Sequence, residues 1–161
     1  MTVVMVPVSR DQLARLREKP IDGPVTGFAV TAALCDTFGL TATDDEEADR
    51  TALLLAALRS LMSYGKRIVV VVEASPVDDG DPLGEVTVPS IAWKDVSAFF
   101  ADSLEAALLV AATARDVAGL DLDNAWDNGY AQALMADHDL LWYGPEEVGA
   151  FLSTWTLAFL D

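Results

Sequence analysis

The sequence has little of what disulfide-bonded and metal-dependent proteins use. It contains a single cysteine, Cys35, and a single histidine, His138. One cysteine excludes an intrachain disulfide, and the two residues together are too few for a site built from several nitrogen and sulfur ligands. The sequence therefore predicts a protein from a reducing compartment that folds without a structural metal and holds no cofactor.

Positive charge is also scarce. The sequence has 10 Lys and Arg residues and 26 Asp and Glu residues, which gives a net charge of −16. Phosphates would be repelled, so neither nucleic acid nor an anionic membrane is expected as a partner. The charge-free apolar runs at 106–114 and 148–160 are much shorter than the roughly 20 residues that span a bilayer. Residues 1–8 lack the basic and apolar regions of a signal peptide. We expect a cytoplasmic protein.

Apolar residues make up 52% of the 161 positions, enough for the core of one domain. Short β-branched runs alternate with helical patterns, which predicts a single α/β domain over residues 1–161, with a mixed sheet of about five to six strands and helices packed on it. The expected strands are 2–8, 25–30, 68–72, 85–88, 96–101 and 139–143. The expected helices begin near residues 9, 31, 43, 102, 123 and 145, and residues 21–24 are expected to form a turn.

Several local patterns refine this expectation. Ser9 with Gln12, and Thr43 with Glu46, have the spacing of capping boxes at helix starts. The uninterrupted run 68–72 is typical of a strand covered on both faces. Apolar stripes recur at helical spacing in two helices, and the second helix is predicted to be buried on most sides because 106–114 is charge-free. The members of the stripes are Leu54, Leu58 and Leu61 in the first helix and Leu104, Leu108 and Ala111 in the second.

Two groups of aspartates have the oxygen-rich spacing that suits Ca²⁺ or Mg²⁺. They are Asp78, Asp79 and Asp81 in one loop, and Asp121, Asp123 and Asp127 at the start of a helix. The second group begins like a calcium loop but lacks the glycine and glutamate that complete one. Turn formation explains the first group and helix capping the second, so we predict no metal site.

The signatures of common enzymes are absent: there is no phosphate-binding loop, dinucleotide fingerprint, nucleophile elbow or zinc spacing. His138 lies between Asp137 and Asp139, where flanking carboxylates favour its charged form and could make it a general base. The catalytic candidates are therefore His138 and Asp139. The alternative is a histidine at the surface or at a strand end, because no nucleophile can be paired with it from the sequence.

Three segments resemble an uncharacterised family of small actinobacterial cytoplasmic proteins. They are Phe28-Ala29-Val30-Thr31-Ala32-Ala33-Leu34, Val69-Val70-Val71-Val72-Glu73 and Asp139-Leu140-Leu141-Trp142-Tyr143. The resemblance runs from the first strand to Glu147, and it implies a bacterial cytoplasmic protein with no assigned activity. This chain departs from the family pattern by continuing well past Tyr143, which suggests that the core is complete near Glu147.

The segment 148–161 is a candidate for self-association. Whether this segment is a helix or a strand, its large apolar side chains lie on one face. Leaving that face in water is unfavourable, so it must cover either the domain's own core or a second copy of the chain. The expected homodimer contacts are Phe151, Leu152, Trp155 and Phe159, with 104–114 as the opposing surface. The sequence therefore favours a non-enzymatic binding or regulatory protein acting through contacts with itself or another protein. The alternative is a small hydrolase-like enzyme using His138 and nearby carboxylates.

Overall fold

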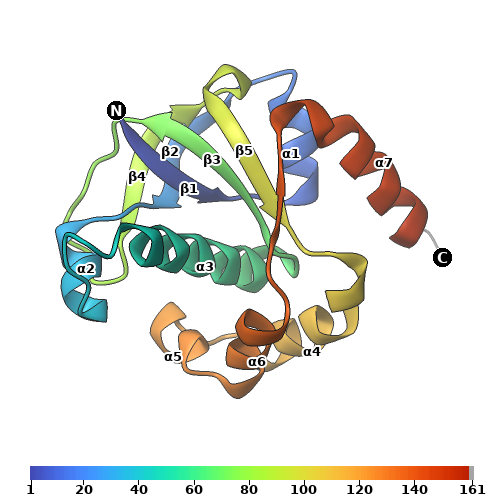
Figure 1. The fold of residues 1–161 in the computed structure, drawn as a ribbon. Helices are drawn as coiled ribbons and strands as arrows, with labels where there is room; N and C mark the ends of the chain where they lie inside the picture. The colour runs from blue at the N-terminus through green and yellow to red at the C-terminus, as the bar shows by residue number, and fades with distance from the viewer. Residues whose placement is uncertain (160–161) are drawn as a thin grey trace.

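Six strands form one sheet in the order β4-β2-β1-β3-β5-β6, and every described pairing between neighbours is antiparallel (Figure 1). The computed structural model describes the backbone of residues 1–159 and the side chains of residues 1–154. The strands are β1 (Thr2–Pro7), β2 (Ile21–Phe28), β3 (Ile68–Ala74), β4 (Glu85–Ile91), β5 (Val96–Ala101) and β6 (Leu141–Tyr143).

Helices cover both faces of the sheet. One face packs against α1 (Arg10–Leu16) and α7 (Val148–Phe159), and the other against α3 (Asp45–Tyr64) and the shorter helices around it. Those shorter helices are α2 (Ala32–Phe38), α4 (Ala107–Val117), α5 (Leu122–Trp126) and α6 (Gly129–Asp137). Three single 3-10 turns complete the chain: η1 (Trp93–Asp95), η2 (Leu104–Ala106) and η3 (Pro145–Glu147).

Strand β3 divides the core into its two layers. Ile68, Val70 and Val72 pack in the layer of α1 and α7, while Val69 and Val71 pack in the layer of α3. This alternation follows from the two-residue period of a strand, and an uninterrupted apolar run is what a strand buried on both faces requires. The predicted α/β fold with helices packed on a sheet of six strands and the two-sided burial of 68–72 are confirmed, but the described strand pairs are all antiparallel, so the sheet is not mixed.

Local predictions at helix starts are confirmed in one case and wrong in another. Ser9 and Gln12 form the predicted capping box of α1. Helix α3 begins at Asp45, so Thr43 is not its cap. The carboxylate of Asp44 instead accepts hydrogen bonds from the backbone and the hydroxyl of Thr41, which closes the turn before the helix.

Three predicted boundaries are also wrong. Residues 21–24 belong to β2, where they form its first half before an irregularity in the pairing with β4. The helix expected to begin near residue 123 is divided into α5 and α6, because Asn128 caps a new helix with its side-chain oxygen. The expected strand 139–143 is shorter, since β6 begins at Leu141, and His138 ends α6.

The C-terminal segment contributes to the core. Val148, Phe151 and Leu152 are buried in the layer of α1, so at these positions the segment covers the domain's own core, the first of the two alternatives, and the core is not complete at Glu147. The side chains of Trp155 and Phe159 lie outside the described residues. Among the described helices, none combines the length and the apolar character needed to cross a bilayer.

Candidate functional site

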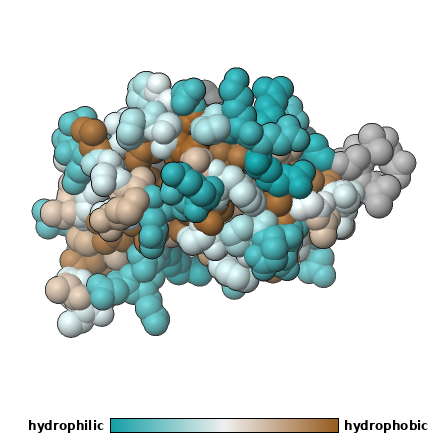
Figure 2. All heavy atoms as spheres, turned by 90° about the horizontal axis from the view of Figure 1, so that it is seen from above, coloured by the Kyte–Doolittle hydropathy of each residue, from teal (hydrophilic) through white to brown (hydrophobic). Residues whose placement is uncertain are grey.

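A groove of about 600 Å³ lies where η2, β6 and the first turns of α7 meet. Its lining is largely apolar, with Leu104 on one side, Leu141 and Tyr143 from the edge strand, and Phe151 from α7. Because β6 is the last strand of the sheet, no further strand covers this end of the described core. Seen from above, hydrophilic side chains cover much of the molecular surface and apolar side chains show between them (Figure 2).

The apolar stripe of the helix beside the groove faces solvent. Leu108 is 87% exposed and Leu104 is 50% exposed, and Ala111 on the same stripe is exposed as well. The prediction that this helix is buried on most sides is therefore wrong. Its buried side carries Val110 and Thr113 instead.

Leu141 of β6 is 44% exposed and lines the same groove as Leu104. We call Leu104, Leu108, Ala111 and Leu141 the leucine surface. Contiguous exposed apolar side chains next to a groove are typical of interaction sites, whereas apolar residues scattered singly over a surface carry no such meaning.

Aromatic rings form the floor of the groove and fix its shape. Tyr143 stacks on Phe99 with 4.9 Å between ring centroids, and Phe151 lies 5.1 Å from Tyr143. Partial burial raises the pKa of the Tyr143 hydroxyl, and the nearby carboxylate of Glu147 raises it further. The hydroxyl is therefore held in its neutral form, as a hydrogen-bonding group beside apolar walls.

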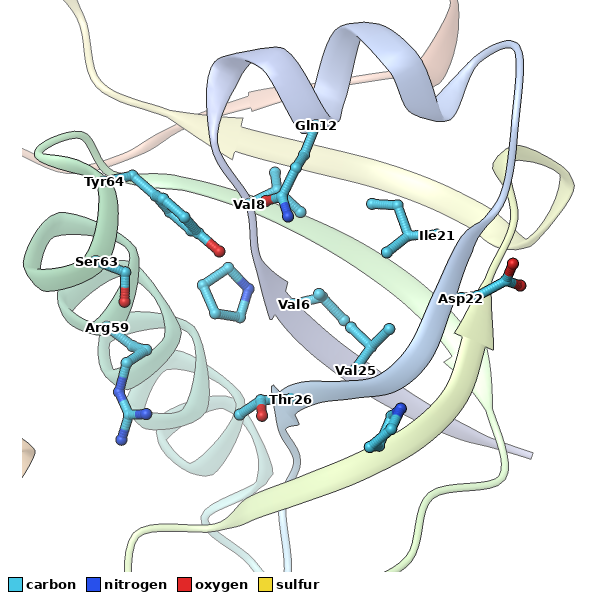
Figure 3. Close-up of a pocket in the computed structure, with 12 residues that line it drawn as sticks. Val6, Val8, Gln12, Ile21, Asp22, Val25, Thr26, Arg59, Ser63 and Tyr64 are labelled. Carbon is cyan, nitrogen blue, oxygen red and sulfur yellow. The ribbon is translucent and has the colours of Figure 1, made fainter.

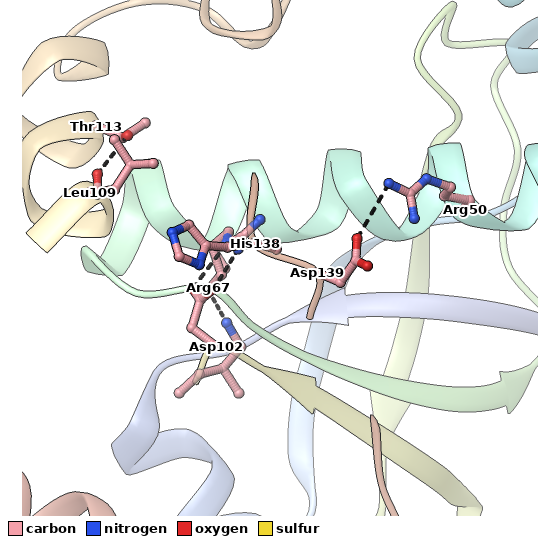
Figure 4. Close-up of polar contacts among 9 residues, drawn as sticks. Arg50, Arg67, Asp102, Leu109, Thr113, His138 and Asp139 are labelled. Carbon is pink, nitrogen blue, oxygen red and sulfur yellow. Dashed lines mark hydrogen bonds and ion pairs between the residues drawn. The ribbon is translucent and has the colours of Figure 1, made fainter. Parts of the chain in front are cut away.

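A buried ion pair anchors the end of the groove where η2 begins. Arg67, directly before β3, donates from Nε to Asp102 at 2.9 Å, and its Nη2 also binds Asp102 (Figure 4). The same Nη2 donates to the backbone carbonyl of His138 at 2.9 Å. Arg67 and Asp102 are only 2% and 7% exposed, so this contact ties β3, β5 and the end of α6 together inside the protein.

Nη1 of Arg67 is buried and has no hydrogen-bond partner among the described residues. A buried N–H group without an acceptor has lost its hydrogen bonds to water, which costs free energy. The hydrogen bonds made by the other nitrogens of Arg67 must offset this cost for the side chain to stay buried.

The catalytic candidates from the sequence lie at this junction but outside the groove. His138 is half-buried, and the contact that joins it to Arg67 uses its backbone carbonyl, not its ring. The carboxylate of Asp139 lies 3.7 Å from Arg50 in an ion pair on the surface (Figure 4). Neither residue lines the groove.

The aspartate groups take the local roles expected of turns and caps. Asp121 accepts a hydrogen bond from the backbone of Asn124 at the start of α5, while Asp123 lies in the first turn of that helix and Asp127 ends it. Asp78 and Asp81 accept backbone hydrogen bonds within their own loop. Across the described part of the chain, no three His, Cys, Asp or Glu side chains are grouped as metal ligands would be.

Residues 2–152 match a family of unknown function, DUF6912. The chain belongs to this family. The match continues past Glu147 and includes Phe151 and Leu152, in agreement with their place in the core. No curated protein and no solved structure matches the chain. Membership brings no activity with it, so the function has to be inferred from the surface itself.

Sequence reasoning missed Arg67, Asp102 and Leu141 as parts of this region. Arg67 directly precedes the apolar run 68–72, but this position does not indicate burial, because charged side chains at the ends of strands usually reach solvent. The exposure of Leu104 and Leu108 could not be predicted from the sequence either. Helical spacing identifies an apolar stripe but does not show whether another element covers it.

Proposed function

We propose that the protein is a non-enzymatic binding or regulatory protein that acts through protein–protein contacts at the leucine surface. One observation carries the proposal: Leu104 and Leu141 are exposed at a groove with an aromatic floor, and the exposed Leu108 lies four residues after Leu104 on the same helical stripe. Each large apolar side chain left in water forgoes roughly 1.5–3 kcal/mol of burial. A surface that gathers several of them gains that free energy when a partner covers it.

A second copy of the chain is the partner that we propose. Two copies each carrying a net charge of −16 repel one another, so contact is least costly where charge is absent. The segments 106–114 and 148–160 contain no charged residue. Phe151 and Leu152 are buried in the core of their own domain, so the contact falls to the leucine surface.

The test is sedimentation analysis of the full chain over a range of concentrations. We expect a dimer that Leu108→Glu converts to a monomer, because a carboxylate in a dry interface is costly to bury. The matched control is Val77→Glu, which places the same charge at an apolar residue that is 56% exposed in a different part of the chain. The control variant is expected to stay dimeric.

A full chain that remains monomeric at high concentration overturns the self-association. If the Leu108→Glu variant is as dimeric as the parent protein, the leucine surface does not form the contact between the two copies. The actinobacterial origin and cytoplasmic location implied by the resemblance stay predictions. The hydrolase alternative is not taken further, because Asp139 is paired with Arg50 and His138 lies outside the groove.

A further inference from the structure

Strand β6 leaves one end of the sheet open. It is the last strand in the order and pairs only with β5, and its segment runs from α6 to α7 in Figure 1. Exposed edge strands can pair with another chain, and proteins usually prevent this with charged side chains or proline. Residues 140–144 contain neither, although the chain carries a net charge of −16, and Pro145 follows them directly. An added strand therefore meets no like charge along this short edge.

The opposite edge of the sheet is already occupied. Thr87 of β4 exchanges two backbone hydrogen bonds with Val77 of the preceding loop, with N···O distances of 2.8 and 3.2 Å. The same loop carries Asp78, Asp79 and Asp81. It both pairs with the edge and places negative charge beside it, as proteins commonly do to protect an edge.

A gap in strand pairing inside the sheet is closed to another chain. Among the described residues, β1 pairs with β2 only at Met5, opposite Phe28, and an opening of about 340 Å³ lies between the two strands. Figure 3 shows that Gln12 and Tyr64 approach it from the two helical layers, whereas the guanidinium of Arg59 is turned away from both. Strands β3 and β4 lie on the outer sides of this pair, so the opening is not an edge.

The hydrogen bonds of β3 show which way the backbone of β5 faces. The N–H of Val8, which follows β1, donates to the carbonyl of Ile68 at 3.1 Å, so the backbone groups of Ile68 face β1. Backbone groups alternate in direction along an antiparallel strand, so those of Val69 face β5. Val69 lies opposite Phe100, and the backbone groups of Phe100 therefore face β3 in return.

The same alternation places the backbone of Trp142 at the open edge. The neighbours of Phe100 in β5 face β6, where they lie opposite Tyr143 and Leu141. The backbone groups of Tyr143 and Leu141 are therefore used within the sheet. Trp142 lies between them and directs its N–H and its C=O away from β5. Neither group bonds to a loop or a side chain among the described residues.

The side chains of β6 divide between the two faces of the sheet. Leu141 and Tyr143 line the groove, so Trp142 points to the opposite face. Phe100, which lies opposite Trp142, packs in the layer of α3. Trp142 is 61% exposed, and Leu141 of the leucine surface is 44% exposed. The edge thus joins unpaired backbone groups to the surface proposed for self-association.

We propose that β6 of a second copy adds to this edge, antiparallel and centred on Trp142, so that the two sheets become one. The inference rests on the proposed self-association and gives it a register. A two-fold axis at Trp142 places residue 140 opposite 144, and Leu141 opposite Tyr143 of the partner copy. Every residue in these pairs is uncharged, so two chains of net charge −16 can share the edge without placing like charges opposite each other.

The pairing is short, so it sets the orientation of the two copies and leaves most of the burial to the leucine surface. The two Trp142 residues exchange both backbone hydrogen bonds, and their rings lie opposite each other on one face as a cross-strand aromatic pair. The N–H of Gly144 already binds Oε2 of Glu147 at 2.7 Å, which ends the pairing. A second copy fits this edge better than an extended peptide, because it also covers the leucine surface, to which Leu141 belongs.

The test uses the full chain at a concentration where it is dimeric, with equal parts of ¹³C-labelled and unlabelled protein. Because Trp142 forms the hydrogen-bonded pair, Leu141 and Tyr143 form the flanking pairs, whose Cα atoms lie about 4.5 Å apart. We expect a nuclear Overhauser effect between the α protons of labelled Leu141 and unlabelled Tyr143. Exchange of the Trp142 amide should also slow by about tenfold or more relative to the diluted monomer.

Trp142→Pro removes the outward N–H, and proline is tolerated at an edge because this N–H makes no bond within the sheet. Its matched control is Trp142→Thr, which removes the same ring and keeps the N–H. In sedimentation, Trp142→Pro should weaken the dimer by about tenfold or more relative to Trp142→Thr, because each copy loses a donor. Circular dichroism checks that both variants fold. If Trp142→Pro does not, the contact between Leu141 and Tyr143 in the parent protein decides.

The outcomes separate this inference from the proposed function. A full chain that stays monomeric overturns both. A dimer that Leu108→Glu dissociates, but that lacks the contact between Leu141 and Tyr143, overturns the pairing of β6 alone. Slowed exchange at Trp142 without that contact also overturns it, because another segment then covers the edge.

Discussion

Helix α3 crosses the sheet and α4 lies at its margin, and their leucines differ accordingly (Figure 1). Leu58 and Leu61 of α3 are 4% and 1% exposed, whereas Leu104 and Leu108 at the other helix are 50% and 87% exposed. The two stripes have the same helical spacing. The difference shows that an apolar stripe is buried only where a sheet or another helix is available to cover it.

The position of α4 depends on contacts other than its leucines. Asp102, just before η2, is bound by Arg67, and Asp116 near the end of α4 accepts a hydrogen bond from the side chain of Asn128 at 2.6 Å. Val110 and Thr113 turn towards the core between these two points. The helix is therefore held by its other face and its ends, which leaves the leucines available for a partner.

The largest effect is expected when the anchor of α4 is removed. Asp102→Ala leaves Arg67 buried without a counter-charge, and breaking a buried pair in this way costs about 3–5 kcal/mol of unfolding free energy. Urea unfolding measures the loss. If α4 is held by this anchor, amide exchange in 104–117 should also rise more than amide exchange in α3.

The control for this prediction is Asp139→Ala, which breaks an ion pair whose side chains are 57% and 79% exposed. Exposed pairs contribute about 0–1 kcal/mol, so the variant should differ little from the parent protein. If the two variants lose equal amounts of unfolding free energy, burial does not determine how much these ion pairs contribute to stability.

The second prediction compares leucines directly. Leu58→Ala should lower the unfolding free energy by about 2–5 kcal/mol, because it opens a cavity in the core. Leu108→Ala should change it by less than about 0.5 kcal/mol, as surface substitutions do. Both are measured at a concentration where the protein is monomeric, and a large loss for Leu108→Ala would contradict the exposure of α4.

Much of the fold can be predicted from the sequence where one local pattern decides the structure. The uninterrupted apolar run 68–72 indicates only a buried strand. The capping box of α1 is formed by Ser9 and Gln12, which are three residues apart in the sequence. The start of α3 was mispredicted because Thr43 and Asp44 are both good caps, and the bonds from Thr41 favour the second. Neighbouring candidates of similar strength are separated only by tertiary context.

The groove could not be predicted, because it is assembled from segments far apart in the chain. Leu104 and Leu141 meet only once β5 and β6 are paired. The same apolar stripe is a core element in one helix and a surface in the other, so periodicity alone leaves both outcomes open.

A third prediction concerns the pH response of the groove beside α4. Burial, and then Glu147, raise the pKa of Tyr143 above its ordinary value of 10.0. The neutral form is favoured in the folded state, so this stabilisation is complete below pH 10.0 and is lost as the pH rises through the raised value. Thermal melting should therefore show the parent protein and Tyr143→Phe diverging only in alkaline solution.

Glu147→Gln sharpens this third prediction. Because burial is the larger cause, the variant should lower the pKa of Tyr143 only in part, as measured by ultraviolet titration of the tyrosine hydroxyls. Glu146→Gln removes the charge of the adjacent residue and is the matched control, which should leave the titration unchanged. A complete return to the ordinary value in Glu147→Gln would mean that the groove does not desolvate its floor.

The smallest effect is expected at the start of α3. Hydrogen bonds from the backbone and then the hydroxyl of Thr41 lower the pKa of Asp44 below 3.8. The stabilisation is present above pH 3.8 and disappears as the pH falls through the lowered value, so Asp44→Asn should reduce the melting temperature slightly at neutral pH and not in acid. The turn before η2 has no matching bond, since Ser103 makes no side-chain cap.

Thr41→Val separates the two causes of this shift. The variant keeps the backbone donor and loses only the hydroxyl, so the pKa of Asp44 should move part of the way back to 3.8 in a carboxylate NMR titration. If the pKa of Asp44 returned fully to its ordinary value, the Thr41 hydroxyl alone would cause the shift. If the pKa did not change, the hydroxyl would have no part in it. The partial return is expected because the backbone bond, which also fixes the turn, is the stronger of the two. Helix α3 then begins at a turn closed by its own sequence, whereas α4 takes its position from the buried Arg67–Asp102 pair.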